Sequence, residues 1–225
     1  MNVTYLYNSG FMVELDQHIL LFDYYLGTIP PLDPSKPLYV FVSHFHQDHY
    51  NPEIYQINHP QITYIIDRKI NNTGYKVHPN QHYVIDDLSI QTLLSTDEGV
   101  AFVIKVENHY IYHAGDLNSW HWIGEPDQDN RYQAGTFNAE IKKISNFDFD
   151  LMMIPLDPRL EETGWWGMAH ILKSVKAKYV LPMHFGKSIK EMHQYLEQDP
   201  LNQYNNIIKI NTEGEIFILD EDNDK

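Results

Sequence analysis

Four side chains that commonly bind divalent metals fall within six residues, directly after an apolar run. The run is Leu38–Val42, whose β-branched and aromatic residues predict a buried strand. The side chains that follow it are those of His44, His46, Asp48 and His49. In an extended chain the first three would project to one side, so His49 needs a turn, or a second ion beside the first. Imidazole nitrogens and carboxylate oxygens are ligands for zinc and similar ions, so this spacing favours a metal site over a histidine-rich surface loop.

Length and composition predict a globular protein with one sizeable core. The chain has 225 residues, of which 43% are hydrophobic, enough for one large α/β domain over residues 1–225. It contains no cysteine, so disulfides and thiolate ligands are excluded and a metal must be held by His, Asp or Glu. No Lys or Arg precedes Lys36, and the longest early apolar run is Ile19–Phe22. These features match neither a signal peptide nor a membrane span, and we expect a cytoplasmic protein.

The charge balance points to a small-molecule partner. With 16 basic against 31 acidic residues, the formal net charge is -15. Such a surface repels phosphate backbones, which argues against a nucleic-acid partner. Several of the acids lie at the C-terminus, between Asp220 and Asp224, and we expect a solvated tail there. The sequence is also compatible with a homo-oligomer.

The remaining pattern predicts two strand-rich regions with helices between and after them. Strands are expected at 3–7, 11–15, 19–22, 62–66, 83–85, 88–94, 101–106, 110–112, 151–154 and 179–181. Helices are expected at 51–58, 132–145, 168–176 and 189–198, a long loop at 120–130, and a closing hairpin from 207–210 and 215–219. Without a repeat or an obvious linker, this order indicates one domain with helices packed outside its sheets.

Two later stretches can complete a metal site. Asp116 lies just past the strand expected at 110–112 and follows Gly115, which lets the backbone approach a neighbour closely. His184 lies at the end of the strand expected at 179–181. Each residue alone is a weak signal. Strand ends that share one edge of an α/β layer are, however, where binding sites usually form, so the three groups together strengthen the prediction.

These motifs resemble those of the metallo-β-lactamase superfamily. The resemblance rests on the HxHxDH run at 44–49, the later Asp116 and His184, and it covers nearly the whole chain. The segments at 113–116 and 182–184 are similar to the branch that includes L-ascorbate-6-phosphate lactonase. The resemblance implies a four-layer αββα sandwich with metals at one edge between the sheets. The positions that match the family's ligands are His44 and His46 for the first ion, Asp48, His49 and His184 for the second, and Asp116 between them.

The sequence departs from this family at one ligand. The family normally supplies a third histidine to the first ion from a loop near the middle of the chain, and the matching stretch at 94–99 has none. Asp97, or less favourably Ser95, can replace it, which would make the site friendlier to manganese as well as zinc. Otherwise His113 or His121 reaches in from elsewhere, or the protein works with one well-held ion. Asp97 as a turn-capping residue is an equally good interpretation.

The expected chemistry is hydrolysis with a metal-activated water. We expect two divalent ions, with zinc favoured and manganese as the alternative, and Asp48 as the catalytic group that orients the water and takes its proton. The substrate would be a small ester, lactone or phosphorylated metabolite. The alternatives are a nucleic-acid-processing phosphodiesterase and a metal-binding protein without turnover.

Candidate substrate-binding residues flank the expected metal site. Trp120, His121 and Trp122 follow Asp116 within a few residues, and aromatic rings with one polar edge suit pocket walls. Packing of these rings onto the sandwich is as good an interpretation. Arg159 can hold an anionic substrate, although a salt bridge with a neighbouring acid is the simpler reading.

Overall fold

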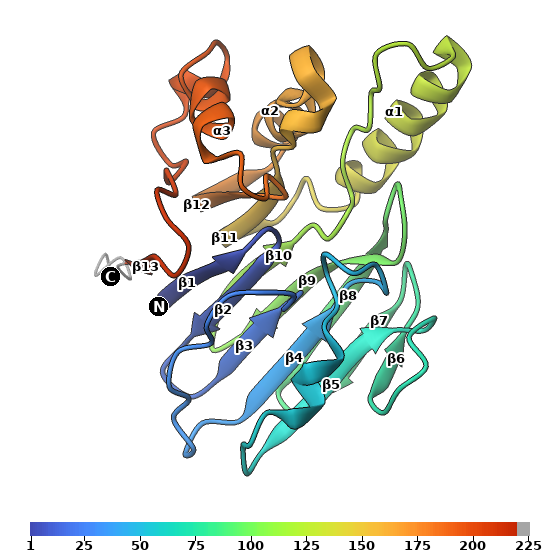
Figure 1. Cartoon of the computed structure of the whole chain (residues 1–225). Helices are drawn as coiled ribbons and strands as arrows, with labels where there is room; N and C mark the ends of the chain where they lie inside the picture. The colour runs from blue at the N-terminus through green and yellow to red at the C-terminus, as the bar shows by residue number, and fades with distance from the viewer. Residues whose placement is uncertain (220–225) are drawn as a thin grey trace.

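A computed structural model describes residues 1–219, and the acidic segment from Asp220 to Asp224 lies outside them. Two β-sheets pack face to face (Figure 1). In sheet order, the first consists of β13 (Ile216–Ile218), β1 (Asn2–Tyr7), β2 (Gly10–Glu14), β3 (Ile19–Phe22), β4 (Leu38–Val42), β5 (Ile62–Asp67) and β6 (Tyr75–Val77). The second consists of β12 (Lys176–Met183), β11 (Asp148–Pro155), β10 (His109–His113), β9 (Val100–Val106), β8 (Leu88–Leu94) and β7 (His82–Ile85).

The alternation of side chains along β4 shows how the first sheet is buried on both faces. Tyr39 and Phe41 point into the main core between the sheets, where the Phe41 ring lies 5.0 Å from that of Phe22 and 5.2 Å from that of Phe102. The intervening residues of β4 belong to a second apolar cluster on the outer face. Burial on both faces explains why this strand is a continuous apolar run in the sequence.

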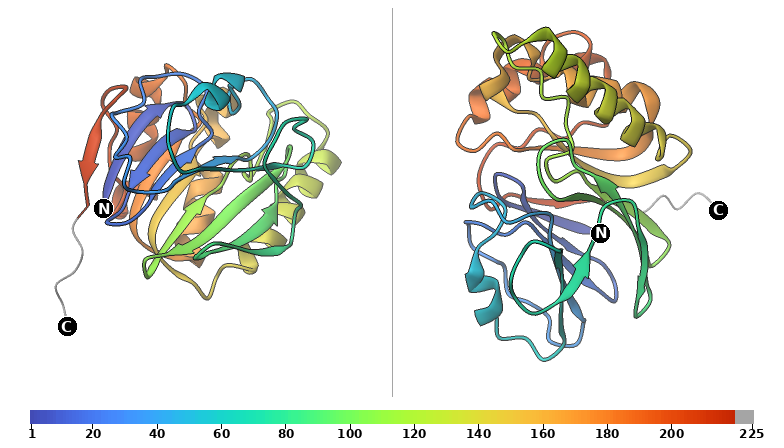
Figure 2. Two further views of the ribbon diagram at one scale, coloured as in Figure 1. Left: turned by 90° about the horizontal axis from the view of Figure 1, so that it is seen from below. Right: turned by 90° about the vertical axis from the view of Figure 1, so that its right-hand side faces the viewer.

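Helices cover the outer faces of the two sheets unequally. The helices α1 (Asp127–Lys142), α2 (Trp166–Ser174) and α3 (Ile189–Leu196) lie on the side of the second sheet (Figure 2). In α1, Phe137 and Ile141 are spaced four residues apart and join the main core. The first sheet is covered by the short 3-10 helix η1 (Pro52–Gln56), whose Ile54 packs in the outer cluster. The αββα fold class is confirmed, with a thin outer layer over the first sheet.

Several predicted elements differ from those observed. The helix expected at 51–58 is the five-residue η1, and α1 begins at Asp127, so it includes the end of the loop expected at 120–130. The closing hairpin is wrong, because β13 pairs with β1 and residue Ile207 makes only an isolated bridge to Val180. The strand β6 and the 3-10 helices η2 (Pro158–Thr163) and η3 (Leu201–Gln203) were not expected.

The strand directions bring the predicted ligands to one edge of the sandwich. β3, β4 and β5 run parallel in the first sheet, and β10, β11 and β12 run parallel in the second. The carboxyl ends of β4, β10 and β12 precede the segments that carry the predicted ligands. Among the helices of residues 1–219, none is both long and apolar enough to cross a bilayer.

Candidate metal centre

The segment after β4 is a compact turn. The backbone N–H groups of His49 and Tyr50 both donate to the carbonyl oxygen of His46, at 3.0 Å each. The chain from His44 to Asp48 is therefore not extended, and the turn that His49 requires is present. The turn lets four nearby side chains face one point, which alternation along a strand does not allow.

Two glycines allow the backbone to approach this turn. Gly99 has a φ of +72°, and a Cβ atom there would lie 2.0 Å from the carbonyl oxygen of Ser43. At Gly115, with a φ of +51°, a Cβ atom would lie 2.8 Å from the Ser43 Cβ. The close approach predicted for Gly115 is thus confirmed, and it brings Asp116 to the turn.

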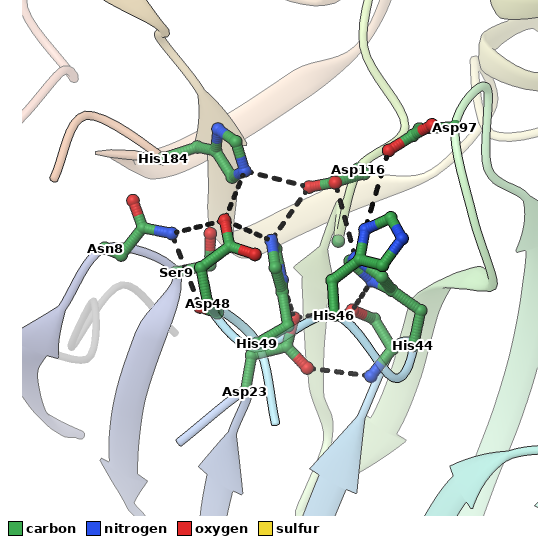
Figure 3. A network of polar contacts seen from close by, with 12 residues as sticks. Asn8, Ser9, Asp23, His44, His46, Asp48, His49, Asp97, Asp116 and His184 are labelled. Carbon is green, nitrogen blue, oxygen red and sulfur yellow. Dashed lines mark hydrogen bonds and ion pairs between the residues drawn. The ribbon is translucent and has the colours of Figure 1, made fainter. Parts of the chain in front are cut away.

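Seven predicted ligands lie together at this edge (Figure 3). They are His44, His46, Asp48, His49, Asp97, Asp116 and His184, in overlapping groups whose candidate ligand atoms lie within 4.8 Å of one another. Asp116 is at the centre of the cluster. Its Oδ2 atom lies 3.4 Å from His44 Nε2, and its Oδ1 atom lies 3.0 Å from His49 Nε2 and 3.2 Å from His184 Nε2. One carboxylate therefore faces two sets of imidazoles through its two oxygens.

The buried atoms at the centre of this cluster have no hydrogen-bond partner among the described residues. They are the Nε2 atoms of His44, His49 and His184 and the Oδ1 atom of Asp116. Although Asp116 is close, the geometry forms no hydrogen bond with these rings. Leaving buried polar groups unpaired costs about 1–3 kcal/mol each. Cations bound among them would satisfy these atoms, so the residues fit a metal centre.

The opposite nitrogen of each buried ring is occupied. His49 Nδ1 lies 2.7 Å from Asp23 Oδ2, His184 Nδ1 lies 3.1 Å from Asp157 Oδ2, and His44 Nδ1 lies 3.0 Å from Ser43 Oγ. Such contacts fix the ring orientation and leave Nε2 facing the centre, as in most protein metal sites.

The pKa values agree with a cation-binding cluster. Burial lowers the pKa of His44 to about 4, which keeps this ring neutral and able to ligate. Burial alone would raise the pKa of Asp116, but His49 and His184 outweigh it and hold the pKa below the usual range. Burial also disfavours the charged form of His184, yet Asp116 raises its pKa to about 9. The carboxylate thus attracts positive charge to this point.

Asp97 and Asp48 lie at the more exposed side of the cluster. Asp97 Oδ2 is 3.8 Å from His46 Nδ1, and burial together with Asp116 raises the pKa of Asp97. Asp48 Oδ2 lies 3.4 Å from His184 Nε2 and accepts a 3.3 Å hydrogen bond from Asn8 Nδ2. Both side chains are about half exposed.

The two other histidines considered as ligands point elsewhere. His113 is fully buried, with Nε2 2.9 Å from the Ser9 carbonyl oxygen, and its Nδ1 accepts from the Gly115 N–H at 3.2 Å. Both its nitrogens are therefore used by the backbone. His121 packs against the ring of Trp166 at 4.8 Å and belongs to no ligand group in residues 1–219.

The predicted substrate-binding residues divide into buried and exposed ones. Trp120 is 5% exposed, donates from Nε1 to the Asp116 carbonyl oxygen at 2.9 Å, and lies edge-on to His184. Trp120 is therefore a buried residue that packs against the candidate ligands. Trp122 is 38% exposed and stacks on Trp120. Arg159 forms a salt bridge with Asp157 at 2.6 Å, as the simpler of the two interpretations of this residue predicted.

Three supporting residues were missed from the sequence. Asp23 and Asp157 are buried and hold His49 and His184, and Asn8 contacts Asp48. Asp23 and Asp157 follow β3 and β11 at the same sheet edge as the ligands. Their position just after a strand was the feature of the sequence that could have identified them. The backbone of His184 is also strained, with a φ of 64°, which is uncommon outside glycine and recurs at functional sites.

Comparisons with known proteins agree with the fold. A two-sheet sandwich with clustered His and Asp side chains at one edge defines a metallo-β-lactamase-type protein. Residues 2–131, more than half of the chain, match a family described as a beta-lactamase superfamily domain. The chain belongs to this superfamily. Membership and the ligand cluster together support an enzyme, a metal-dependent hydrolase.

Solved structures with this fold are distant in sequence. Igni18, described as a metallo hydrolase from the archaeon Ignicoccus hospitalis, has a TM-score of 0.65 at 17% identity, covering 96% of this chain and 98% of that one. YhfI from Bacillus subtilis has a TM-score of 0.61 at 16% identity, covering 96% and 99%. An isothiocyanate hydrolase from Delia radicum gut bacteria has a TM-score of 0.62 at 14% identity, covering 97% of this chain and 99% of that one. A search of curated protein sequences found no match.

Proposed function

We propose that this protein is a hydrolase with two divalent metal ions, acting on a small ester, lactone or phosphorylated metabolite. One observation carries the proposal. The Nε2 atoms of His44, His49 and His184 are buried without hydrogen-bond partners around Asp116, whose two oxygens face different rings. A carboxylate shared in this way suits a pair of ions better than one.

The ligands divide between two ions as the family resemblance implies. We assign His44, His46 and Asp97 to the first ion and Asp48, His49 and His184 to the second, with Asp116 shared. The contact between His46 and Asp97 supports the first set, and the contacts of Asp48 with the other two rings support the second. Nitrogen and oxygen donors without a thiolate suit zinc or manganese.

The reaction is supported by the placement of Asp48. A bound divalent ion lowers the pKa of water from about 16 to about 7 and polarises a substrate oxygen. Asp48 Oδ2 faces His49 and His184, while its Oδ1 atom makes no hydrogen bond or ion pair with the described residues. We infer that this free oxygen orients the attacking water and accepts its proton, as a general base within hydrogen-bond reach.

The substrate class is supported by aromatic residues near the ligands, since Trp120 lies edge-on to His184 and Trp122 stacks on Trp120. We infer that Trp122 and His121 contact the substrate, with Trp120 behind them, and that Arg159 binds a negative group. The lactonase-like branch remains our proposal, because the segments at 113–116 and 182–184 carry that similarity. A net charge of -15 disfavours a nucleic-acid substrate.

The remaining inferences concern the chain as a unit. We infer that residues 1–225 form one domain, since β13 pairs with β1 in one sheet and joins the two ends of the described chain. A cytoplasmic location and a homo-oligomer stay predictions from the sequence.

The test combines metal content with turnover. We expect elemental analysis to find about two ions per chain, and hydrolysis in a panel of esters, lactones and phosphodiesters only with metal. Asp48→Ala and His46→Ala should abolish hydrolysis and leave a folded protein. His78→Ala is the control, because His78 is exposed and its side chain makes no hydrogen bond or ion pair within residues 1–219. Full turnover in both site variants would contradict the proposal.

A further inference from the structure

A cavity of about 290 Å³ lies directly beside the metal ligands. Asp48 and His184 line it, and so do two basic residues, Arg159 and Lys187. A larger cavity of about 620 Å³ lies at the opposite ends of the strands and contains none of the candidate ligands. Resting on the proposed function, we propose that the smaller cavity binds a compact anionic group of the substrate, a carboxylate or a phosphate, through Arg159 and Lys187.

Arg159 is held in position before any ligand arrives. Its Nε and Nη2 atoms donate to the Asp157 carboxylate at 3.0 and 2.6 Å, and Asp157 is 1% exposed. The arginine side chain itself is 62% exposed, so the remaining guanidinium donors are accessible. A guanidinium fixed on one side by a buried carboxylate loses little further entropy when it binds an anion on the other.

Lys187 supplies a positive charge that the protein does not neutralise. It makes no side-chain hydrogen bond or ion pair within residues 1–219. Lysines line other cavities as well, but Lys209, for one, is paired there with Glu197 at 3.1 Å, in a chain with 31 acidic and 16 basic residues. A lysine left without an acidic partner in such a chain is available to an anionic ligand.

The acidic groups in the cavity already have partners. Asp157 accepts from Arg159 and lies 3.1 Å from His184 Nδ1. Asp48 faces His184 and the metal cluster and is bonded to Asn8. With ions bound at the cluster, the charges of Asp48 and Asp116 are offset. The cavity then presents a net positive surface, mainly from Lys187 and the free edge of Arg159.

The size and walls of the cavity fit a small substrate. Its volume is at the lower end of the range for ligand pockets, about 300–1,000 Å³. Tyr7 and Tyr25 form an aromatic wall, with ring centres 6.1 Å apart, and each carries a phenol that can donate to an anion. These features favour a small substrate with one anionic group over a long or bulky substrate.

Binding of simple anions tests the inference directly. Inorganic phosphate and acetate are titrated calorimetrically into the metal-loaded protein, into Lys187→Met, and into Lys190→Met. Lys190 lies three residues further on, in α3, and does not line the cavity, so its variant is a matched control for lost charge. We expect at least one anion to bind wild type, with affinity about tenfold weaker in Lys187→Met and unchanged in Lys190→Met.

Each result of this titration decides the question. The anion that binds more tightly identifies the class as phosphate or carboxylate. If anions bind at the metal ions alone, Lys187→Met and Lys190→Met will have the same anion affinity, and this outcome overturns the inference. Absence of binding of both anions to wild type overturns it as well.

A pair of esters separates this inference from the proposed function. para-Nitrophenyl butyrate and the para-nitrophenyl monoester of succinate differ by a methyl group in place of a carboxylate. We expect kcat/KM to favour the succinate ester, and Lys187→Met to reduce that preference about tenfold through KM. Turnover of both esters without preference in wild type supports the hydrolase and overturns the binding of a substrate carboxylate at this cavity. Metal-loaded protein that hydrolyses neither ester, yet binds anions through Lys187, supports the site and contradicts the hydrolase.

Discussion

At the scale of single residues, we propose that Asp97 takes the place of the third histidine at the first ion. It faces His46 from the connection between β8 and β9, at a contact of 3.8 Å. We predict that Asp97→Ala lowers the metal content from about two ions per chain to about one. Asp97→His should restore two ions and favour zinc over manganese, because imidazole is the softer ligand.

Elemental analysis after dialysis against equal zinc and manganese measures both effects. Glu98→Ala is the control, since Glu98 is the next residue but pairs with Lys69 and belongs to no ligand group in the described chain. Asp97→Ala that retains two tightly held ions would identify Asp97 as a turn-capping residue only.

Asp23 contacts a candidate metal ligand and belongs to no ligand group itself among the described residues. Its Oδ2 atom lies 2.7 Å from His49 Nδ1, and the same carboxylate accepts from the N–H and hydroxyl of Ser43. Asp23→Asn keeps the volume but turns one acceptor into a donor. We predict metal affinity lower by about 10- to 100-fold, measured by competition with a chelator. Asp33→Asn changes an exposed carboxylate in a distant turn and should leave affinity unchanged.

At the scale of elements, the connection between β8 and β9 must pass close to the metal-binding turn. Gly99 makes this possible, with a positive φ and no room for a side chain beside Ser43. We predict that Gly99→Ala lowers the free energy of unfolding by about 2 kcal/mol or more, because it combines backbone strain with a backbone clash. Gly135→Ala, in α1 with open space around it, should instead raise it by about 0.5–1 kcal/mol.

Denaturant titration of both metal-free variants measures these changes. Metal-free protein is used so that lost metal binding does not contribute to the difference. Equal free energies of unfolding for the two glycine variants would contradict the prediction. They would show that the backbone beside Ser43 shifts to make room for a side chain at residue 99 without loss of stability.

Elements with strong local patterns could be predicted from the sequence, and elements defined by distant partners could not. The strand β4 and the turn after it could be predicted because their residue types alone indicate a buried strand followed by metal ligands. β6 has three residues, and its pairing with β5 is a tertiary feature. Residues 207, 208 and 210 are isoleucines because Ile210 is buried in the core and the other two pack against it, and this burial produces the same apolar pattern as a strand. β13 pairs with β1, more than 200 residues away, which no hairpin rule anticipates.

The same distinction applies to the site. The ligands from 44–49 were evident because they are adjacent in sequence, and Asp116 and His184 because each ends a strand. The contacts of Asp23 and Asp157 depend on which strand ends become neighbours across two sheets. Residue types alone do not contain that information, since an aspartate after a strand is usually a turn residue.

At the scale of the whole molecule, the metal cluster joins the two sheets. His44 and His49 follow β4 of the first sheet, whereas Asp116 and His184 follow β10 and β12 of the second. Ions held by both sets, as we propose, would link the sheets at the edge where the carboxyl ends of their strands meet. Since the unfolded chain does not assemble such a site, metal binding should contribute to the stability of the whole sandwich.

Thermal unfolding tests this coupling. Free metal at 100 times its dissociation constant stabilises a protein by about 2.7 kcal/mol, which for a chain of this length raises Tm by about 5 to 10 °C. We predict this shift between chelator-treated and metal-loaded wild type, measured by calorimetry. The double variant H44A and H184A removes one ligand from each sheet and should abolish the shift, whereas His78→Ala should retain it. The same Tm with and without metal in wild type would show that the ions, if held, do not couple the sheets, because only binding confined to the folded sandwich raises its stability.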